Sequence, residues 1–244
     1  MNMIKKITII LLISMSFLTI GFSKGCNPNV DGIKWYHDSA EKKALYIQAY
    51  NVASQKIKHE VATQKLKKGE WGIILDVDET TLDDSWVEYS DYKNYEFNEN
   101  IYLKVKGVAT PGVVKFTHFI HNLGGLVSFV TNRHATDEKI IEATVRNLEK
   151  EDVYLDQVLF SNPKLENKDD KNPRFKAVET GKYNEDIITT SKLPPHMVIA
   201  YFGDNIQDFP NLKQKDMAKA NEDAFKGFGN KYFIVPNSMY GSWM

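Results

Sequence analysis

The sequence predicts an α/β fold: a three-layer sandwich with a central parallel sheet, a small cap and an added N-terminal helix. Short apolar runs alternate along the chain with segments of helical periodicity, which is typical of parallel strands joined by helices. No internal repeat or low-complexity stretch interrupts this alternation. The predicted strands cover residues 71–75, 126–130, 158–160, 197–202 and 232–235.

A long helix is expected before the first strand. Asp38 is a candidate N-cap, and Glu41 follows it three residues later, as in a capping box. From Leu45 to Val61, apolar residues recur at helical spacing, and the opposite face is charged. We expect this helix to pack against the body as structure, with no catalytic role.

Three shorter helices are expected between the strands. Thr110 and Pro111 form a good N-cap and first-turn pair for the first of these helices, and Gly124 ends it. The other two helices are expected over 137–149 and 174–180, each carrying apolar residues at helical spacing.

The first 25 residues have the pattern of an export signal. Lys5 and Lys6 precede an apolar run over 7–20, which is too short for a comfortable membrane-spanning helix. The alternatives are a buried N-terminal helix or a membrane anchor. Export predicts a location in the bacterial periplasm or at the outer membrane.

Cys26 is the only cysteine of the chain and directly follows this segment. A lone cysteine at that position predicts a lipid-modified N-terminus, although Ser23 and Lys24 depart from the usual lipidation motif. The alternative is ordinary cleavage that leaves a free thiol. Residues 26–35 are expected to form a tether, and residues 36–244 a single domain.

The charge of the chain argues against a nucleic-acid polymer as partner. The formal net charge is −1, and the export signal contributes only lysines, so the remainder is more acidic than the whole. Proteins that bind nucleic acid usually carry a basic patch. The six histidines show no zinc-like spacing.

Carboxylates follow two of the predicted strands. Asp76 and Asp78 come at the end of the first, and Asp204 and Asp208 at the end of the fourth. Strand ends in open α/β sheets are where ligands bind. Because crowded carboxylates repel one another, a divalent cation with oxygen ligands is expected there, and Mg²⁺ is the obvious candidate. The pattern predicts Mg²⁺-dependent chemistry on an anion, most plausibly phosphate.

The residues around these aspartates form two motifs that resemble the signatures of class C acid phosphatases of bacterial cell surfaces, within the haloacid dehalogenase (HAD) superfamily. The similarity extends over nearly the whole chain after the export signal, with Ile206 in place of the usual leucine and Asp84 in place of asparagine or threonine. The motifs are Asp76-Val77-Asp78-Glu79-Thr80-Thr81-Leu82 and Gly203-Asp204-Asn205-Ile206-Gln207-Asp208-Phe209.

The resemblance implies a HAD-like fold and Mg²⁺-dependent hydrolysis of phosphomonoesters, nucleoside 5′-monophosphates included. Asp76 would be the nucleophile, forming an aspartyl phosphate. Asp78 would act as acid and base, and its backbone carbonyl would help to bind the metal. Asp204 would complete the metal site, and Asp208 would support it through water or through a contact outside the set of direct ligands.

The same resemblance gives candidate residues at two further places, after the strand over 126–130 and before the helix over 174–180. Thr131 would bond a phosphoryl oxygen, and Asn132 would contact substrate. Lys171 would offset the negative charge of the phosphoryl group and Asp76, with Lys168 as the alternative lysine. Arg133 and His134 are expected to be exposed loop residues, or substrate contacts at most.

Residues 83–109 are expected to form the cap over the site, the alternative being a surface insertion whose aromatic residues pack on the body. Phe97 in this segment and Tyr240 near the C-terminus are the favoured pair for stacking on a nucleobase. The expected partners are small phosphomonoesters, with membrane contact only through a lipid anchor and a possible homodimer. A phosphotransferase and a non-catalytic surface lipoprotein or adhesin are the alternative functions.

Overall fold

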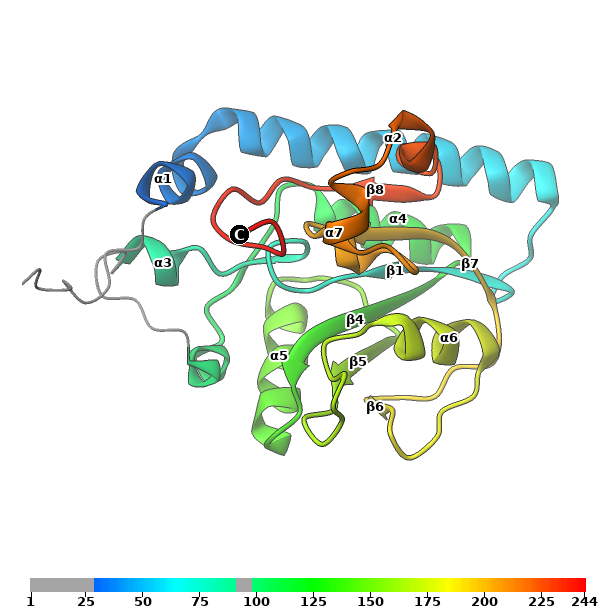
Figure 1. The fold of residues 1–244 in the computed structure, drawn as a ribbon. Helices are drawn as coiled ribbons and strands as arrows, with labels where there is room; N and C mark the ends of the chain where they lie inside the picture. The colour runs from blue at the N-terminus through cyan, green and yellow to red at the C-terminus, as the bar shows by residue number, and fades with distance from the viewer. Residues whose placement is uncertain (1–28, 91–97) are drawn as a thin grey trace, which may run out of the picture.

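A computed structural model describes residues 29–90 and 98–244 of the chain. A six-stranded sheet lies at its centre in the order β6-β5-β4-β1-β7-β8 (Figure 1). All neighbouring strands are parallel except β6, which is antiparallel to β5. The strands are β1 (Trp71–Leu75), β4 (Leu126–His134), β5 (Gln157–Ser161), β6 (Ile188–Thr189), β7 (Met197–Gly203) and β8 (Tyr232–Ile234).

The strand order reverses at β1. The next parallel strand of this sheet, β4, pairs with one side of β1, whereas the later strand β7 pairs with its other side. Chain connections therefore diverge to opposite sides at this point, which opens a crevice beyond the carboxyl ends of the two strands. The acidic motifs follow β1 and β7, so the fold brings both to this crevice.

Helices cover both faces of the sheet, because successive residues of a buried strand point to opposite faces. Ile73 and Leu75 belong to the larger hydrophobic cluster, which includes side chains of α2 and α4, and Ile74 belongs to a second cluster that includes side chains of α6. The helices of eight residues or more are α1 (Val30–Asp38), α2 (Ala40–Gln64), α4 (Val113–Leu123), α5 (Glu138–Lys150) and α6 (Asn172–Thr180). The α/β three-layer prediction is confirmed.

The prediction of a tether over 26–35 is wrong from Val30 onward, where α1 begins. Ile33 and Tyr36 are 1% and 0% exposed, so burial of these two side chains holds the helix against the body. The long helix α2 is capped by Ser39, whose hydroxyl accepts a hydrogen bond from the Lys42 amide, and not by the predicted Asp38.

The helix after the insertion also begins later than predicted. Gly112 is the N-cap of α4, with a φ of 93° that favours glycine, and Gly124 ends the helix as expected. Thr110 does not cap this helix with its side chain; its hydroxyl instead donates to the Thr80 carbonyl oxygen at 2.7 Å. The Thr110 side chain therefore joins α4 to the loop after β1.

The insertion over 83–109 starts and ends in a two-stranded antiparallel ladder, β2 (Leu82–Asp83) with β3 (Val108–Ala109). Between them lie α3 (Trp86–Ser90) and the 3₁₀-helix η1 (Glu99–Lys104). The Asn147 side chain of α5 bonds both backbone polar groups of Gly107, at 2.9 and 2.7 Å. These bonds attach the insertion to α5 at one end.

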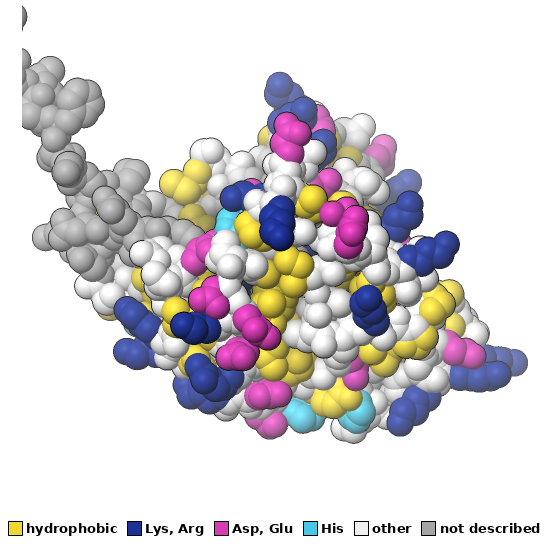
Figure 2. Space-filling view, turned by 90° about the horizontal axis from the view of Figure 1, so that it is seen from below, with side chains coloured by type: hydrophobic (Ala, Val, Ile, Leu, Met, Phe, Trp, Pro, Cys, Tyr) yellow, Lys and Arg dark blue, Asp and Glu magenta, His cyan; other side chains and the backbone are white. Residues whose placement is uncertain are grey.

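The described residues contain no helix that is long and apolar enough to span a membrane. The face seen in Figure 2 carries acidic and basic side chains around a central strip of hydrophobic side chains. The remaining short elements are the helix α7 (Gln214–Met217) and the 3₁₀-helices η2 (Ile206–Asp208) and η3 (Glu222–Phe225).

Candidate active site

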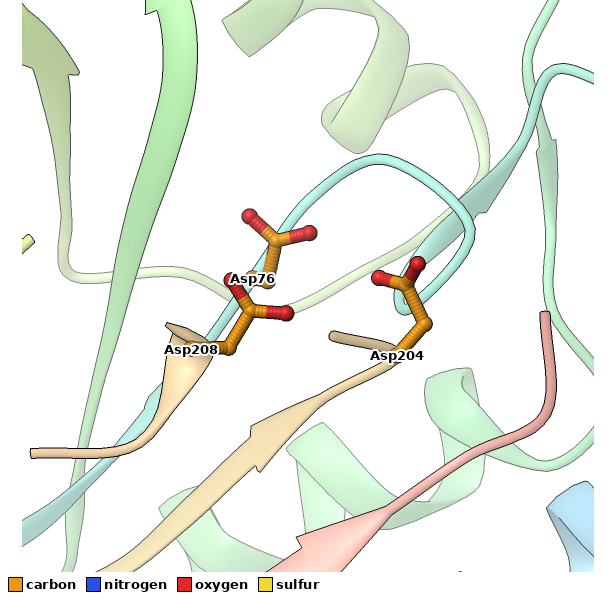
Figure 3. A group of neighbouring side chains, drawn as sticks. All are labelled: Asp76, Asp204 and Asp208. Carbon is orange, nitrogen blue, oxygen red and sulfur yellow. The ribbon is translucent and has the colours of Figure 1, made fainter. Parts of the chain in front are cut away.

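Three carboxylates meet beyond the ends of β1 and β7 (Figure 3). Asp76 directly follows β1, Asp204 directly follows β7, and Asp208 lies in η2. One oxygen from each of the three lies within 4.8 Å of the others. Gly203 permits this approach, because a Cβ at that position would collide with the Asp208 side chain.

Burial makes the negative charge of this cluster costly. Asp76 and Asp208 are each 7% exposed. Desolvation raises the pKa of Asp76 well above its ordinary value, against the opposing effect of Lys171. Desolvation and the neighbouring Asp208 raise the pKa of Asp204 to about 7. The three oxygens therefore form a site that a divalent cation would stabilise.

Lys171 contributes a buried cation to this cluster. Its Nζ contacts the Asp76 carboxylate and lies 2.6 Å from Asp208 Oδ1. Burial alone would lower the pKa of Lys171, but the two carboxylates outweigh it and raise the pKa. The structure therefore brings the Lys171 side chain to the aspartates. The Lys168 carbonyl oxygen accepts a hydrogen bond from the Ser161 hydroxyl.

Asp78 points to a different set of partners. Its Oδ1 accepts from Arg133 Nη2 at 2.8 Å and from Arg133 Nε at 3.0 Å. The Thr131 hydroxyl lies 3.3 Å from Asp78 Oδ2. Arg133 Nη2 also donates to Asp84 Oδ2 at 2.8 Å. Asp78 is thus held by β4 while Asp76 contacts the lysine.

The expectation that Arg133 is an exposed loop residue is wrong, since it is only 2% exposed. Strand β4 continues four residues beyond the predicted end at Val130, so Arg133 lies on the same side of the strand as Thr131. Asp78 and Asp84 raise the pKa of Arg133 against the effect of burial. His134 is half-buried, between Glu99 and Asp169.

Thr131 and Asn132 are both engaged within the protein. Thr131 is fully buried, and its hydroxyl accepts from the Arg133 amide at 3.1 Å. Asn132 lines the pocket, but its Oδ1 accepts from Arg174 Nη2 at 2.6 Å and its Nδ2 donates to the Asp169 carbonyl. Arg174, which the sequence did not suggest, therefore fixes the end of β4, and burial lowers its pKa to about 10.

A cavity of about 510 Å³ connects these residues. Tyr102 of η1 lines it from the insertion, and Tyr240 lines it from the C-terminal segment. Among the described residues that line the cavity, eight are Asp or Glu, and the Lys and Arg residues are Lys171 and Arg133. The excess of carboxylates opposes the binding of an anion, and added positive charge would reduce that repulsion. Phe97 and Cys26 lie outside the described residues.

The first two helices support the loop that follows Asp78. Glu79 has a φ of 51°, unusual for a residue with a side chain. Its carbonyl oxygen accepts from the Tyr46 hydroxyl and, at 3.3 Å, from Tyr36. Tyr50 donates to the next carbonyl, that of Thr80, at 2.9 Å. The long helix was expected to have a structural role, and these contacts place it directly behind the acidic loop.

The sequence and the fold are similar to those of known proteins. Residues 19–243 match the family described as HAD superfamily, subfamily IIIB (acid phosphatase). Two structures of the class C acid phosphatase from Bacillus anthracis are similar, each with 28% identity over 89% of this chain and 87% of that one. Their TM-scores are 0.75, for the structure with tungstate bound, and 0.74. With its two acidic motifs at adjacent strand ends, the chain belongs to the acid phosphatases of HAD subfamily IIIB.

Proposed function

We propose that this chain hydrolyses phosphomonoesters with Mg²⁺, through an aspartyl phosphate on Asp76, outside the cytoplasm. The observation that carries the proposal is the buried cluster of Asp76, Asp204 and Asp208 in contact with Lys171. That arrangement combines a nucleophile, a cation and a set of oxygen ligands at one strand end. These groups suit phosphoryl transfer, because its catalysis is largely positioning and charge stabilisation.

The donor atoms fit Mg²⁺. Asp76, Asp204 and Asp208 offer carboxylate oxygens within 4.8 Å of one another, and the Asp78 backbone carbonyl is the further proposed ligand. The raised pKa values of Asp76 and Asp204 reflect negative charge that lacks sufficient compensation. Bound there, the ion would neutralise charge on the phosphoryl oxygens. Because Asp208 also bonds Lys171 and the Asn205 amide, it suits a supporting role in this site.

The residues divide the reaction between them. An Asp76 oxygen attacks phosphorus, the bond from phosphorus to the ester oxygen breaks, and Asp78 gives a proton to the leaving alcohol. Asp78 then takes a proton from the water that releases phosphate from Asp76. Lys171 offsets the charge on the phosphoryl oxygens and on Asp76. We still predict that the Thr131 hydroxyl bonds a phosphoryl oxygen. In that role it would give up its contact with the Asp78 carboxylate.

Nucleoside 5′-monophosphates are the proposed substrate class. Tyr240 is 37% exposed and lines the pocket, so its ring can meet a flat leaving group. Stacking on a base is worth about 1–3 kcal/mol. Phe97 is the proposed second ring, and Asn132 the proposed polar contact. Tungstate, present in the Bacillus anthracis structure, is a tetrahedral oxyanion like phosphate, which supports phosphate chemistry in this fold.

The N-terminal sequence supports export, with Cys26 as the proposed lipid attachment site. An enzyme at the bacterial periplasm or outer membrane would release phosphate and nucleoside from molecules that cannot cross a membrane while charged. We propose small phosphomonoesters as partners, with no nucleic-acid polymer and a possible homodimer. The structure describes neither Cys26 nor the segment before it.

A phosphate-release screen over phosphomonoesters tests the proposal, with Mg²⁺ and with a chelator. We expect Mg²⁺-dependent release that the chelator abolishes, and measurable turnover of nucleoside 5′-monophosphates. Release that is unaffected by the chelator would refute the metal assignment. No release from any phosphomonoester would favour the non-catalytic alternative, and phosphoryl transfer to an added alcohol in place of water would favour the phosphotransferase.

A further inference from the structure

Arg133 connects the proposed acid to the insertion that borders the pocket. Its Nε and Nη2 hold the Asp78 carboxylate at 2.8–3.2 Å, and Nη2 also bonds Asp84 Oδ2 at 2.8 Å. Its Nη1 donates to Thr144 Oγ1 of α5 at 3.1 Å. Its Cζ lies 3.9 Å from the centre of the Tyr102 ring. One guanidinium group thus contacts the loop after β1, the insertion and α5.

We propose that Arg133 is a positioning residue for proton transfer by Asp78, and that it couples this transfer to the placement of the insertion. The proposal rests on the proposed function, since it takes Asp78 as the group that protonates the leaving alcohol. The Arg133 side chain is 1% exposed and is already paired with two carboxylates. It is therefore poorly placed to bind the substrate phosphate itself and acts through Asp78.

The geometry explains why a guanidinium group suits this task. A planar fork of donors fixes the orientation of a carboxylate, whereas an ammonium group acts as a single point charge. The Asp78 side chain lines the pocket. Without the two donors of Arg133, its carboxylate could rotate away from the oxygen of the leaving alcohol. Misplacement by about 1 Å can reduce a catalytic rate about a hundredfold.

The remaining contacts place the insertion in the same network. Asp84 follows β2 and Tyr102 belongs to η1, so both come from residues 83–109. A ring stacked on a buried guanidinium group stabilises its position. Displacement of Asp84 and Tyr102 would remove two of the contacts that orient Arg133. We therefore expect the insertion to influence proton transfer, in addition to any contact it makes with the substrate.

Leaving-group dependence tests this role, because a poor leaving group needs a proton and a good one does not. The values to measure are kcat/KM for an alkyl phosphate and for p-nitrophenyl phosphate. This constant reports only the steps up to alcohol release. The variants are Arg133→Met and Arg133→Lys, with the exposed Arg146→Met of α5 as matched control and Asp78→Asn in parallel.

We expect Arg133→Met to lose about a hundredfold on the alkyl phosphate and less than tenfold on p-nitrophenyl phosphate, with an unchanged rise in Tm on adding Mg²⁺. Arg133→Lys should show the same selectivity with a smaller loss, and it decides the question if the methionine variant does not fold. Tyr102→Ala should show the selectivity more weakly. Arg146→Met should match the wild type on both substrates.

Equal losses on both substrates in a folded Arg133 variant would overturn the inference, because they would indicate a structural role alone. A selective loss in Asp78→Asn without one in the Arg133 variants would overturn the positioning role and leave the proposed function intact. If Asp78→Asn itself loses equally on both substrates, Asp78 is not the acid, and the proposed mechanism fails first.

Discussion

Asp204→Asn should make the metal-free protein more stable at neutral pH and should abolish its response to Mg²⁺. The Asp204 carboxylate accepts hydrogen bonds from Thr80 Oγ1 at 3.0 Å and from Asn237 Nδ2 at 2.9 Å. An asparagine can keep the second bond through its carbonyl oxygen, and the Thr80 hydroxyl can turn to accept from the new amide. The substitution therefore removes a charge and keeps the local hydrogen bonds.

The raised pKa of Asp204 sets the size and sign of this effect. The carboxyl group ionises near 3.8 in the unfolded chain and at about 7 in the folded one. Above pH 4 the folded state binds more protons than the unfolded state, so stability falls as pH rises and levels off above pH 7. A shift of about 3 pKa units at about 1.4 kcal/mol each gives an upper limit of about 4 kcal/mol. Water that enters the site would make the actual loss of stability smaller than this limit.

Thermal unfolding measures this effect directly. In a chelating buffer, Asp204→Asn should unfold at a higher temperature than wild type at pH 7.5, by about 2–4 °C for each kcal/mol. The difference should shrink towards zero near pH 4. In saturating Mg²⁺, wild type should gain about 3 kcal/mol at a hundred times Kd, and the variant should gain nothing. The exposed Asp223→Asn is the matched control and should follow the wild type throughout.

Three outcomes would contradict this reasoning about Asp204. One is a metal-free variant that is no more stable than wild type at pH 7.5, since the buried charge would then carry no cost. Another is a variant that still gains stability with Mg²⁺, which would exclude Asp204 as a ligand. The third is an advantage of the variant that grows as pH falls, which would contradict the sign of the pKa shift.

Three further substitutions test separate parts of the proposal. Asp76→Asn should fold and bind metal more weakly yet lose essentially all turnover, since an amide is a poor nucleophile; phosphate release within tenfold of wild type would contradict this. Tyr240→Ala should raise KM for a nucleoside 5′-monophosphate with little change in kcat and little effect on an aliphatic phosphate; an equal loss on both, or a lower Tm that accounts for it, would make Tyr240 structural. Cys26→Ser should move the exported protein from the membrane fraction to the soluble fraction; mass spectrometry of a soluble wild type with an unmodified N-terminus would exclude the lipid anchor.

The positions of the acidic residues could be predicted from the sequence because each motif directly follows a buried strand. Trp71–Leu75 and Met197–Gly203 are apolar runs that end at a carboxylate, and adjacent parallel strands end at the same edge of a sheet. An apolar run followed by a carboxylate is a local pattern. It can therefore be recognised in the sequence without knowledge of the tertiary contacts.

Arg133 could not be predicted in the same way. The apolar run of β4 ends at Val130, and the next four residues are polar or charged, so the pattern indicates a loop. Burial of the arginine depends on Asp84 and Tyr102, which come from the insertion and are distant in the sequence. A buried cation needs such partners, and its own sequence neighbours do not show them.

The predicted starts of α2 and α4 were wrong for a related reason. Thr110 and Ser39 both have side chains that can cap a helix, and only Ser39 does so. The Thr110 hydroxyl bonds the Thr80 carbonyl, an acceptor that the turn after β1 brings close. Capping preferences describe hydrogen bonds within one segment, and they do not include a buried carbonyl from another segment that orients the hydroxyl.

The contacts of Glu79 show that the N-terminal helices support the loop that carries Asp76 and Asp78. A left-handed backbone at a residue with a side chain costs about 1–2 kcal/mol, so it persists only where other contacts hold it. Tyr36 and Tyr46 supply those contacts from α1 and α2, and their hydroxyls lie 2.7 Å apart. The turn they stabilise separates Asp78 from Thr80, whose hydroxyl bonds Asp204. The family match begins at residue 19, before α1 and α2, so both helices lie within the region common to the family. They are additions to the sheet, and they also support the acidic loop that follows β1.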